Sequence, residues 1–286
     1  MSTSYLNGQY ITRKNAKISI EDRGFNFSDG VYEVFCFSNR NILDYKQHLK
    51  RLKRSLKEIK INFPFSNTST LKLIIERLIL INRINSGIIY LQITRGSSVR
   101  NHLFPENINS NIIINLYPEK DLSDVKKGIK VVTLPDLRWK RCDIKSISLL
   151  PNVLGKQSAK DLGVYEVWQT YGNEIISEGT TSNSFIVSKN NEIITHPSNY
   201  KILGGITRSN ILKIAKKNKF KVLEKEFKLN QAYKSKEAFL TSSTVGILPV
   251  IKINQEVIGN GELGSVTKEL MELFNSFLKK QIKKNE

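Results

Sequence analysis

A lysine in the segment from Leu137 to Leu150 is a candidate for covalent catalysis. A lysine amine can hold an aldehyde as a Schiff base only where burial or a cationic neighbour favours its neutral form. If this stretch is extended, Lys145 shares one face with apolar Ile147 and charged Asp143, at the border between an apolar interior and a polar cleft. Lys145 could therefore bind an aldehyde cofactor.

A second segment, Glu178-Gly-Thr-Thr-Ser-Asn, follows about thirty residues after this lysine. Taken together, the two segments predict the two halves of a pyridoxal phosphate site. The chain contains 45 lysines and arginines, and most such side chains are simply solvated on a protein surface. The surface alternative therefore stays open if Lys145 is considered alone.

Two further segments could hold a phosphate, which needs helix N-terminal N–H groups, hydroxyls and a cation. The turn Gly204-Gly205 runs directly into an expected helix at Thr207, and Thr241 to Thr244 supply a run of hydroxyls. Either could equally be an ordinary turn or loop. Arg51 could supply the positive charge, although helical spacing alone does not separate it from the other cations at positions 50, 53 and 54.

The stretch from Arg95 to Asn107 carries two arginines and one of the three histidines of the chain. Arg100 can bind a carboxylate through two parallel hydrogen bonds, and His102 can add another. A solvated basic loop is the competing interpretation. No His, Cys or acidic cluster has metal-ligand spacing, so no metal site is predicted.

Composition limits the class of protein. The formal charge of +19 raises nucleic acid as a partner, but the basic residues are spread among helical apolar positions without an aromatic stacking platform. A nucleic-acid-binding protein is therefore a distant alternative. No apolar run approaches the ~20 residues of a membrane span, and the two cysteines are too few for a disulfide framework. We expect a cytoplasmic protein that contacts neither membrane nor nucleic acid.

The pattern of strands and helices is mixed, which disfavours a doubly wound parallel sheet. It predicts two domains, a small one over 1–118 and a larger one over 128–286, with a linker over 119–127. The expected strands are 17–20, 30–37, 88–94, 111–116, 129–133, 165–168, 184–187, 192–195 and 238–241. The expected helices are 45–59, 71–81, 151–163, 207–217 and 266–280, the first supported by a stripe of Tyr45, Leu49, Leu52, Leu56 and Ile59.

The chain resembles the D-amino-acid aminotransferases, which belong to the class IV pyridoxal phosphate enzymes. The segments that carry the likeness occur in the same order through nearly the whole chain: 21–25, 29–34, 48–52, 95–107, 138–150, 178–183, 203–208 and 241–244. The resemblance implies an α+β fold of two domains with the cofactor in the cleft between them. It also implies a homodimer in which the loop bearing Arg100 and His102 reaches the second subunit.

The resemblance also implies a role for each candidate residue. Lys145 would form the Schiff base and carry the proton, and Glu178 would hold the pyridine nitrogen protonated. The phosphate would be bound by Arg51, Ile206, Thr207, Ser242 and Ser243. The substrate carboxylate would be bound by Tyr32, Arg100 and His102.

The activity implied is transfer of the amino group of a D-alanine-like amino acid to a 2-oxo acid such as 2-oxoglutarate, with ping-pong kinetics. Sister enzymes of the class are the alternatives: an L-branched-chain aminotransferase, an R-selective amine transaminase or an aminodeoxychorismate lyase. The Arg100 and His102 pair favours D-amino acids. Thr180 and Thr181 stand where serines are usual in the family, which leaves the side-chain range of the substrate open.

Overall fold

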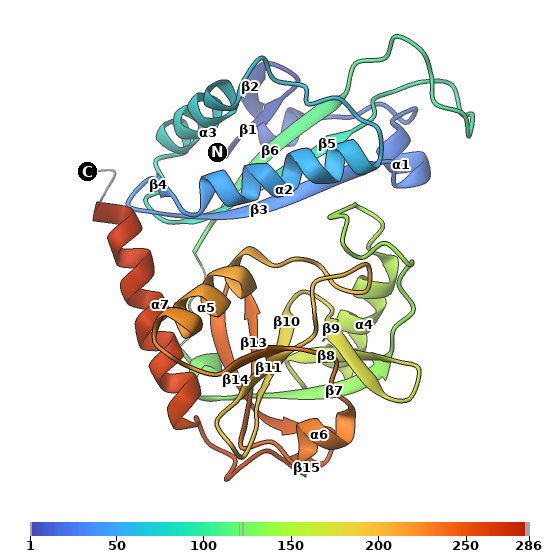
Figure 1. Cartoon of the computed structure of the whole chain (residues 1–286). Helices are drawn as coiled ribbons and strands as arrows, with labels where there is room; N and C mark the ends of the chain where they lie inside the picture. Colours follow the sequence, from blue (N-terminus) through green and yellow to red (C-terminus); the bar gives the residue numbers. More distant parts are fainter. Residues whose placement is uncertain (1, 120, 122, 284–286) are drawn as a thin grey trace. The chain divides into compact units, whose positions relative to one another are not determined.

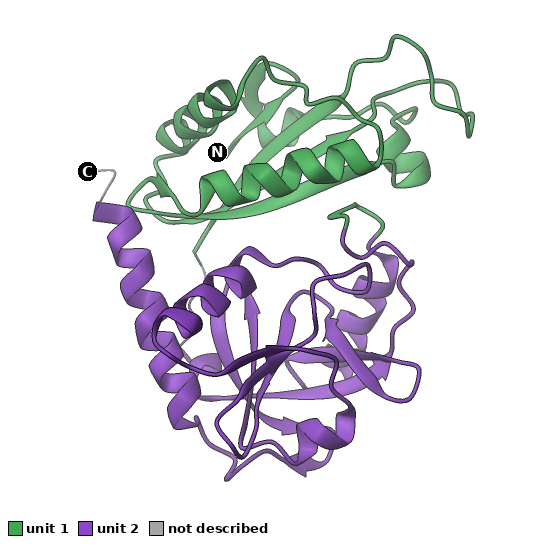
Figure 2. Cartoon of the chain, in the orientation of Figure 1, with its two compact units in different colours: residues 1–120, 144–148, 284–286 green, residues 121–143, 149–283 purple. Residues whose placement is uncertain are grey.

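The computed structural model describes residues 2–119, 121 and 123–283, which divide into two compact units (Figure 2). Unit 1 comprises residues 2–119 together with 144–148, and unit 2 comprises the rest of the described chain. The expected linker at 119–127 includes residues 120 and 122, which lie outside the described residues. The predicted domain limits therefore stay a prediction, and the sequence pattern did not anticipate that residues 144–148 belong to unit 1.

Unit 1 is built on an antiparallel sheet with the strand order β2-β1-β6-β5-β3-β4 (Figure 1). Its strands are β1 (Thr3–Leu6), β2 (Gln9–Thr12), β3 (Gly30–Ser38), β4 (Asn41–Ile42), β5 (Gly87–Thr94) and β6 (Asn111–Pro118). Its helices are η1 (Arg13–Asn15), α1 (Arg23–Phe27), α2 (Tyr45–Glu58) and α3 (Thr68–Asn82). The helices α2 and α3 cover one face of the sheet, where alternate strand residues such as Phe35, Leu91 and Ile114 form the core.

Helix α2 confirms the expected stripe, since Leu49, Leu52 and Leu56 are buried against the sheet. Three polar residues share this buried face, His48, Arg51 and Ser55. Buried polar groups require hydrogen-bond partners. Their partners lie on β3 and on the segment 144–148, as described below.

Unit 2 is built on a mixed sheet in the order β12-β11-β10-β13-β14-β7-β8-β9, with β15 paired to β14. Its strands are β7 (Ile129–Pro135), β8 (Glu166–Tyr171), β9 (Ile175–Gly179), β10 (Asn183–Val187), β11 (Ile193–Thr195), β12 (Val222–Glu224), β13 (Glu237–Ser242), β14 (Gly246–Ile253) and β15 (Glu256–Val257). Its helices are η2 (Val125–Lys127), α4 (Leu150–Asp161), α5 (Ile206–Lys217), α6 (Leu229–Tyr233) and α7 (Ser265–Lys283).

Both faces of this second sheet are buried. Phe185 and Phe239 stack at 4.7 Å on the face covered by α5 and α7, whereas Ile186 and Leu240 belong to the core of the opposite face. This alternation explains why the strands are almost continuously apolar. It also places Thr241, two residues after Phe239, on the side of α5.

Most expected elements are confirmed within a few residues, and two differences have clear causes. Residues 17–20 follow η1 without regular structure and form no strand, and Ile20 is 79% exposed, so its side chain is not part of the core. Strand β14 was not predicted, because Pro249 lies in the middle of it. Proline lacks the N–H that a central strand donates to its neighbours. The ladder between β14 and β7 begins at Val250, directly after this proline.

Candidate functional site

The segment that carries Lys145 lies along β3 in unit 1. The N–H of Tyr32 donates to the carbonyl of Lys145 at 3.0 Å, and the N–H of Ile147 donates to the carbonyl of Gly30 at 3.1 Å. On α2, Ser55 Oγ accepts from the N–H of Lys145 at 3.2 Å. The backbone on which this lysine stands is therefore held from two sides, by the strand and by the helix.

The amine of Lys145 lies over an aromatic ring. Its Nζ is 4.1 Å from the ring centroid of Tyr32, and the rings of Tyr32 and Tyr90 are 5.7 Å apart. Tyr32 and Tyr90 alternate with the core residues of their strands, so they lie on the sheet face opposite α2 and α3. The structure thus brings together Lys145 and Tyr32, two of the predicted site residues.

Arg51 is fixed by a buried carboxylate that the sequence pattern did not single out. Its Nε donates to Glu33 Oε1 at 2.7 Å and its Nη2 donates to Oε2 at 2.8 Å, while His48 Nδ1 lies 2.8 Å from Oε2. The cations at positions 50, 53 and 54 are all exposed, and Arg51 is buried. The structure therefore separates Arg51 from these neighbours, which helical spacing could not do.

The electrostatics of this cluster favour an ionised carboxylate. Burial raises the pKa of Glu33, but the Arg51 charge and the hydrogen bonds of Arg51 and His48 outweigh it and lower the pKa to about 2. Burial lowers the pKa of His48. The result is a charged Glu33–Arg51 pair with a neutral imidazole beside it.

Acid titration should expose the contribution of this pair to stability. The folded-state pKa of Glu33 lies below its ordinary value, so its contribution is complete above pH 4.5 and is lost as the pH falls towards 2. The fall from 4.5 to about 2 corresponds to about 3 kcal/mol of unfolding free energy. Denaturant unfolding of the wild type should show this loss across that window, and Glu33→Gln should show a flatter profile. Parallel profiles of the two proteins would contradict the pairing.

Glu178 lies on β9 in unit 2 and is buried among hydrogen-bond donors. It forms an ion pair with Arg138, while its Oε1 accepts from the N–H of Leu203 at 2.9 Å and its Oε2 accepts from Asn183 Nδ2 at 2.7 Å. Burial raises the pKa of Glu178, and the Arg138 charge opposes this only in part. Asp136 holds the other side of Arg138, with contacts at 2.9 and 2.7 Å.

Asn183 connects this carboxylate to the predicted phosphate turn. Its Nδ2 also donates to the carbonyl of Leu203 at 3.0 Å, and Asn183 pairs with Thr241 across the β10–β13 ladder. A Cβ on Gly205, the N-terminal cap of α5, would lie 2.0 Å from Asn183 Oδ1. Only glycine therefore lets the chain enter α5 so close to this amide, and the predicted residues Ile206 and Thr207 form the first turn of that helix.

The hydroxyl cluster lies at the end of β13. Ser242 ends the strand and its Oγ is 3.2 Å from Thr244 Oγ1, with Ser243 between them in the turn. Thr241 is buried, and its Oγ1 has no hydrogen-bond partner in the part of the chain that the structure describes. A buried hydroxyl without a partner on the α5 side of the sheet is suited to donate to an anion at the helix N-terminus.

A second buried glutamate, Glu166 on β8, was also missed by the sequence pattern. It accepts from Thr181 Oγ1 at 2.9 Å and from Ser182 Oγ at 3.2 Å, and it is also hydrogen-bonded to Thr180. Thr180 and Thr181 are the two threonines singled out in the sequence. Glu166 therefore orders the segment that follows Glu178.

Arg100 and His102 lie in unit 1, on the exposed loop between β5 and β6 (Figure 1). The ring of Phe27, the last residue of α1, is 4.9 Å from Arg100 Cζ and 5.2 Å from the imidazole of His102. No hydrogen bond, ion pair or ring contact in the described chain joins either side chain to Tyr32 or Lys145. In unit 1 the predicted residues thus form two pairs, Lys145 with Tyr32 and Arg100 with His102, while Arg51 pairs with the unpredicted Glu33. In unit 2, Glu178 is joined through Asn183 to the turn before α5.

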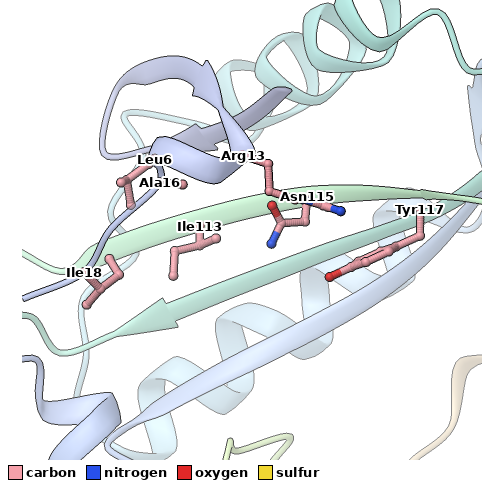
Figure 3. A pocket seen from close by; sticks show the side chains of 7 residues that line it. All are labelled: Leu6, Arg13, Ala16, Ile18, Ile113, Asn115 and Tyr117. Carbon is pink, nitrogen blue, oxygen red and sulfur yellow. The ribbon is translucent and has the colours of Figure 1, made fainter. Parts of the chain in front are cut away.

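A cavity of about 270 Å³ in unit 1 is lined by residues of β1, β6 and the segment 13–18 (Figure 3). None of the predicted site residues lines it. Across the residues described, no cluster of three or more His, Cys, Asp or Glu could hold a metal ion. No helix within the described ranges is both long and apolar enough to cross a bilayer.

The family model for amino-transferase class IV matches residues 30–253 of the chain. The chain belongs to the class IV aminotransferases. It is 35% identical to the D-alanine aminotransferase of Staphylococcus haemolyticus and 36% identical to that of Bacillus licheniformis, in both cases over 97% of this chain and 98% of the relative.

Solved structures confirm the fold expected for this class IV aminotransferase. The branched-chain aminotransferase of the archaeon Thermoproteus uzoniensis, solved with norvaline, superposes with a TM-score of 0.88 at 22% identity, covering 98% of this chain and 95% of that one. The predicted α+β aminotransferase fold is therefore correct, and the family model and the relatives confirm the predicted membership of class IV.

Proposed function

We propose that this aminotransferase uses pyridoxal 5'-phosphate to move the amino group of a D-alanine-like amino acid to a 2-oxo acid such as 2-oxoglutarate. The observation that carries the proposal is the 35–36% identity to D-alanine aminotransferases over 97% of the chain. The pair of exposed donors on Arg100 and His102 supports it, because no hydrogen bond or ion pair in the described chain occupies either side chain.

The residues present fit the proposed cofactor. Glu178 is a buried carboxylate that keeps acceptor capacity on Oε2 for the pyridine N–H, because a carboxylate oxygen can accept two hydrogen bonds and Oε2 accepts one from Asn183. The N-terminus of α5 with Ile206 and Thr207, together with Ser242 and Ser243, offers N–H groups and hydroxyls to a phosphate. Arg51, oriented by Glu33, supplies the positive charge.

When bound, pyridoxal phosphate would supply the aldehyde that receives the amino group, and its ring would withdraw electrons from the substrate α-carbon. Lys145 would hold the cofactor, and its amine would take the proton from the substrate α-carbon. The substrate carboxylate would be held by Tyr32, Arg100 and His102. Its position decides which face of the substrate presents the α-proton to Lys145. The first oxo acid leaves before the second enters, so the kinetics are ping-pong.

The assembly proposed is a homodimer in which the loop of Arg100 and His102 serves the second subunit. The same loop exposes Val99, Leu103 and Phe104, which are 83%, 75% and 54% exposed. Apolar side chains gathered on one loop favour a protein contact over permanent exposure to water. The homodimer, the cytoplasmic location and the cofactor position between the two domains stay predictions.

Steady-state assays with paired donors test the substrate class. With 2-oxoglutarate as acceptor, we expect D-alanine to yield pyruvate and L-leucine to yield little of its oxo acid, because Arg100 and His102 fix the carboxylate on one side. The Lys145→Ala protein is the blank for both reactions. Turnover of L-leucine alone would assign the chain to the branched-chain group of the same class.

A further inference from the structure

We infer that Phe27 is a positioning residue whose ring fixes Arg100 and His102 as one carboxylate-binding unit. This inference rests on the proposed function, because the role of the two donors comes from it. The argument starts from the loop between β5 and β6, which has no secondary structure of its own between residues 99 and 108 apart from turns and bends. Its two donors must therefore be positioned by contacts with the rest of unit 1.

The base of this loop is closed by Asp22, the N-terminal cap of α1. Asp22 accepts from Thr94 Oγ1 and from Asn111 Nδ2, both at 2.6 Å, and so joins the end of β5 to the start of β6. Its Oδ1 also accepts from the N–H of Phe25 at 3.2 Å, which begins the helix. Helix α1 is thus attached to both strands from which the loop departs.

The middle of the loop is held by two arginines that share Asp29. Arg95 donates to both carboxylate oxygens of Asp29, at 2.7 and 2.9 Å, and its guanidinium lies 3.7 Å from the ring centroid of Phe104. Arg23 donates to Asp29 at 2.9 Å and to the backbone carbonyl of Asn101. Asn101 lies between the two donors, so the chain is fixed at this point.

The contacts above fix the loop backbone, and Phe27 positions the side chains of Arg100 and His102. Its ring is contacted by three side chains: Arg23 Cζ at 4.8 Å, Arg100 Cζ at 4.9 Å and the imidazole of His102 at 5.2 Å. A guanidinium is attracted to the face of a ring without forming hydrogen bonds to it, so its N–H donors remain available to a carboxylate. Phe27 therefore limits the rotamers of Arg100 and His102 while leaving their donors unoccupied.

Replacing the ring should weaken substrate binding and spare the chemistry. In Phe27→Leu we expect the KM of both the amino acid and the oxo acid to rise about fivefold, since the ring contacts of Arg100 and His102 are both lost and each such exposed contact is weak. We expect kcat and the visible absorbance of bound cofactor to stay at the wild-type level. Phe27→Tyr, which keeps the ring, should restore the wild-type KM.

Phe63→Leu is the matched control. Lys53 Nζ lies 4.8 Å from the ring centroid of Phe63, and both residues are in unit 1. Phe63→Leu therefore removes a similar cation–ring contact away from the loop. Its KM values should be those of the wild type. If Phe27→Leu folds poorly, Phe27→Met, which also lacks the ring, takes its place. Combined with Arg100→Ala, either change should raise the KM by less than the product of the two single effects, because the contact with Arg100 is already lost. Additive effects, or an unchanged KM in Phe27→Leu, would overturn the inference, whereas an inactive wild type would instead refute the proposed function.

Discussion

Replacement of Lys145 by alanine is expected to lower kcat by at least about a thousandfold, because it removes both the covalent attachment and the base that moves the substrate proton. The structure makes this a clean test. The backbone of Lys145 is held by Tyr32 and Ser55 through its own carbonyl and N–H, which the substitution leaves intact. The fold of unit 1 should therefore survive while the amine is lost.

The measurements are the rate of pyruvate formation from D-alanine and the visible absorbance of the purified protein. Both should collapse in Lys145→Ala. Lys140→Ala is the matched control, since Lys140 is an exposed lysine five residues earlier in the same segment. If Lys145→Ala kept substantial turnover, or if Lys140→Ala lost it, the assignment of the catalytic lysine would be wrong.

The second large effect is expected at Glu178. Glu178→Gln keeps the shape of the side chain but replaces an ionised acceptor by a neutral amide, which cannot keep a pyridine nitrogen protonated. Loss of one such preorganised electrostatic contact typically lowers kcat by about a hundredfold or more. Arg138 stays paired with Asp136, so stability should fall much less than activity.

The matched control for this variant is Glu192→Gln, which removes a surface carboxylate that pairs with Lys221 in unit 2. Its kcat should be unchanged. Comparing kcat with the denaturation midpoint for both variants separates a chemical role from a structural one. If Glu178→Gln retained both the cofactor and the wild-type kcat, the residue that binds the pyridine nitrogen would not be Glu178.

The sequence alone indicated the class IV family, because the segments that carry the likeness are short and have a recognisable composition. The roles assigned to the individual site residues stay predictions. Lys145, Glu178 and the glycine turn before Thr207 were each visible as local patterns, and their collinear order indicated class IV. The helical stripe of α2 was equally clear from Leu49 to Leu56, since apolar periodicity is set by the helix itself.

Only the tertiary structure decided which polar residues support these groups. Glu33 and Arg51 are 18 positions apart and meet because β3 packs under α2, and Asp29 meets Arg95 across 66 positions. Local periodicity reports the face that a residue occupies but not its partner on another element. For the same physical reason, the attachment of residues 144–148 to β3 and the contact of Phe27 with Arg100 and His102 appeared only once the chain was folded.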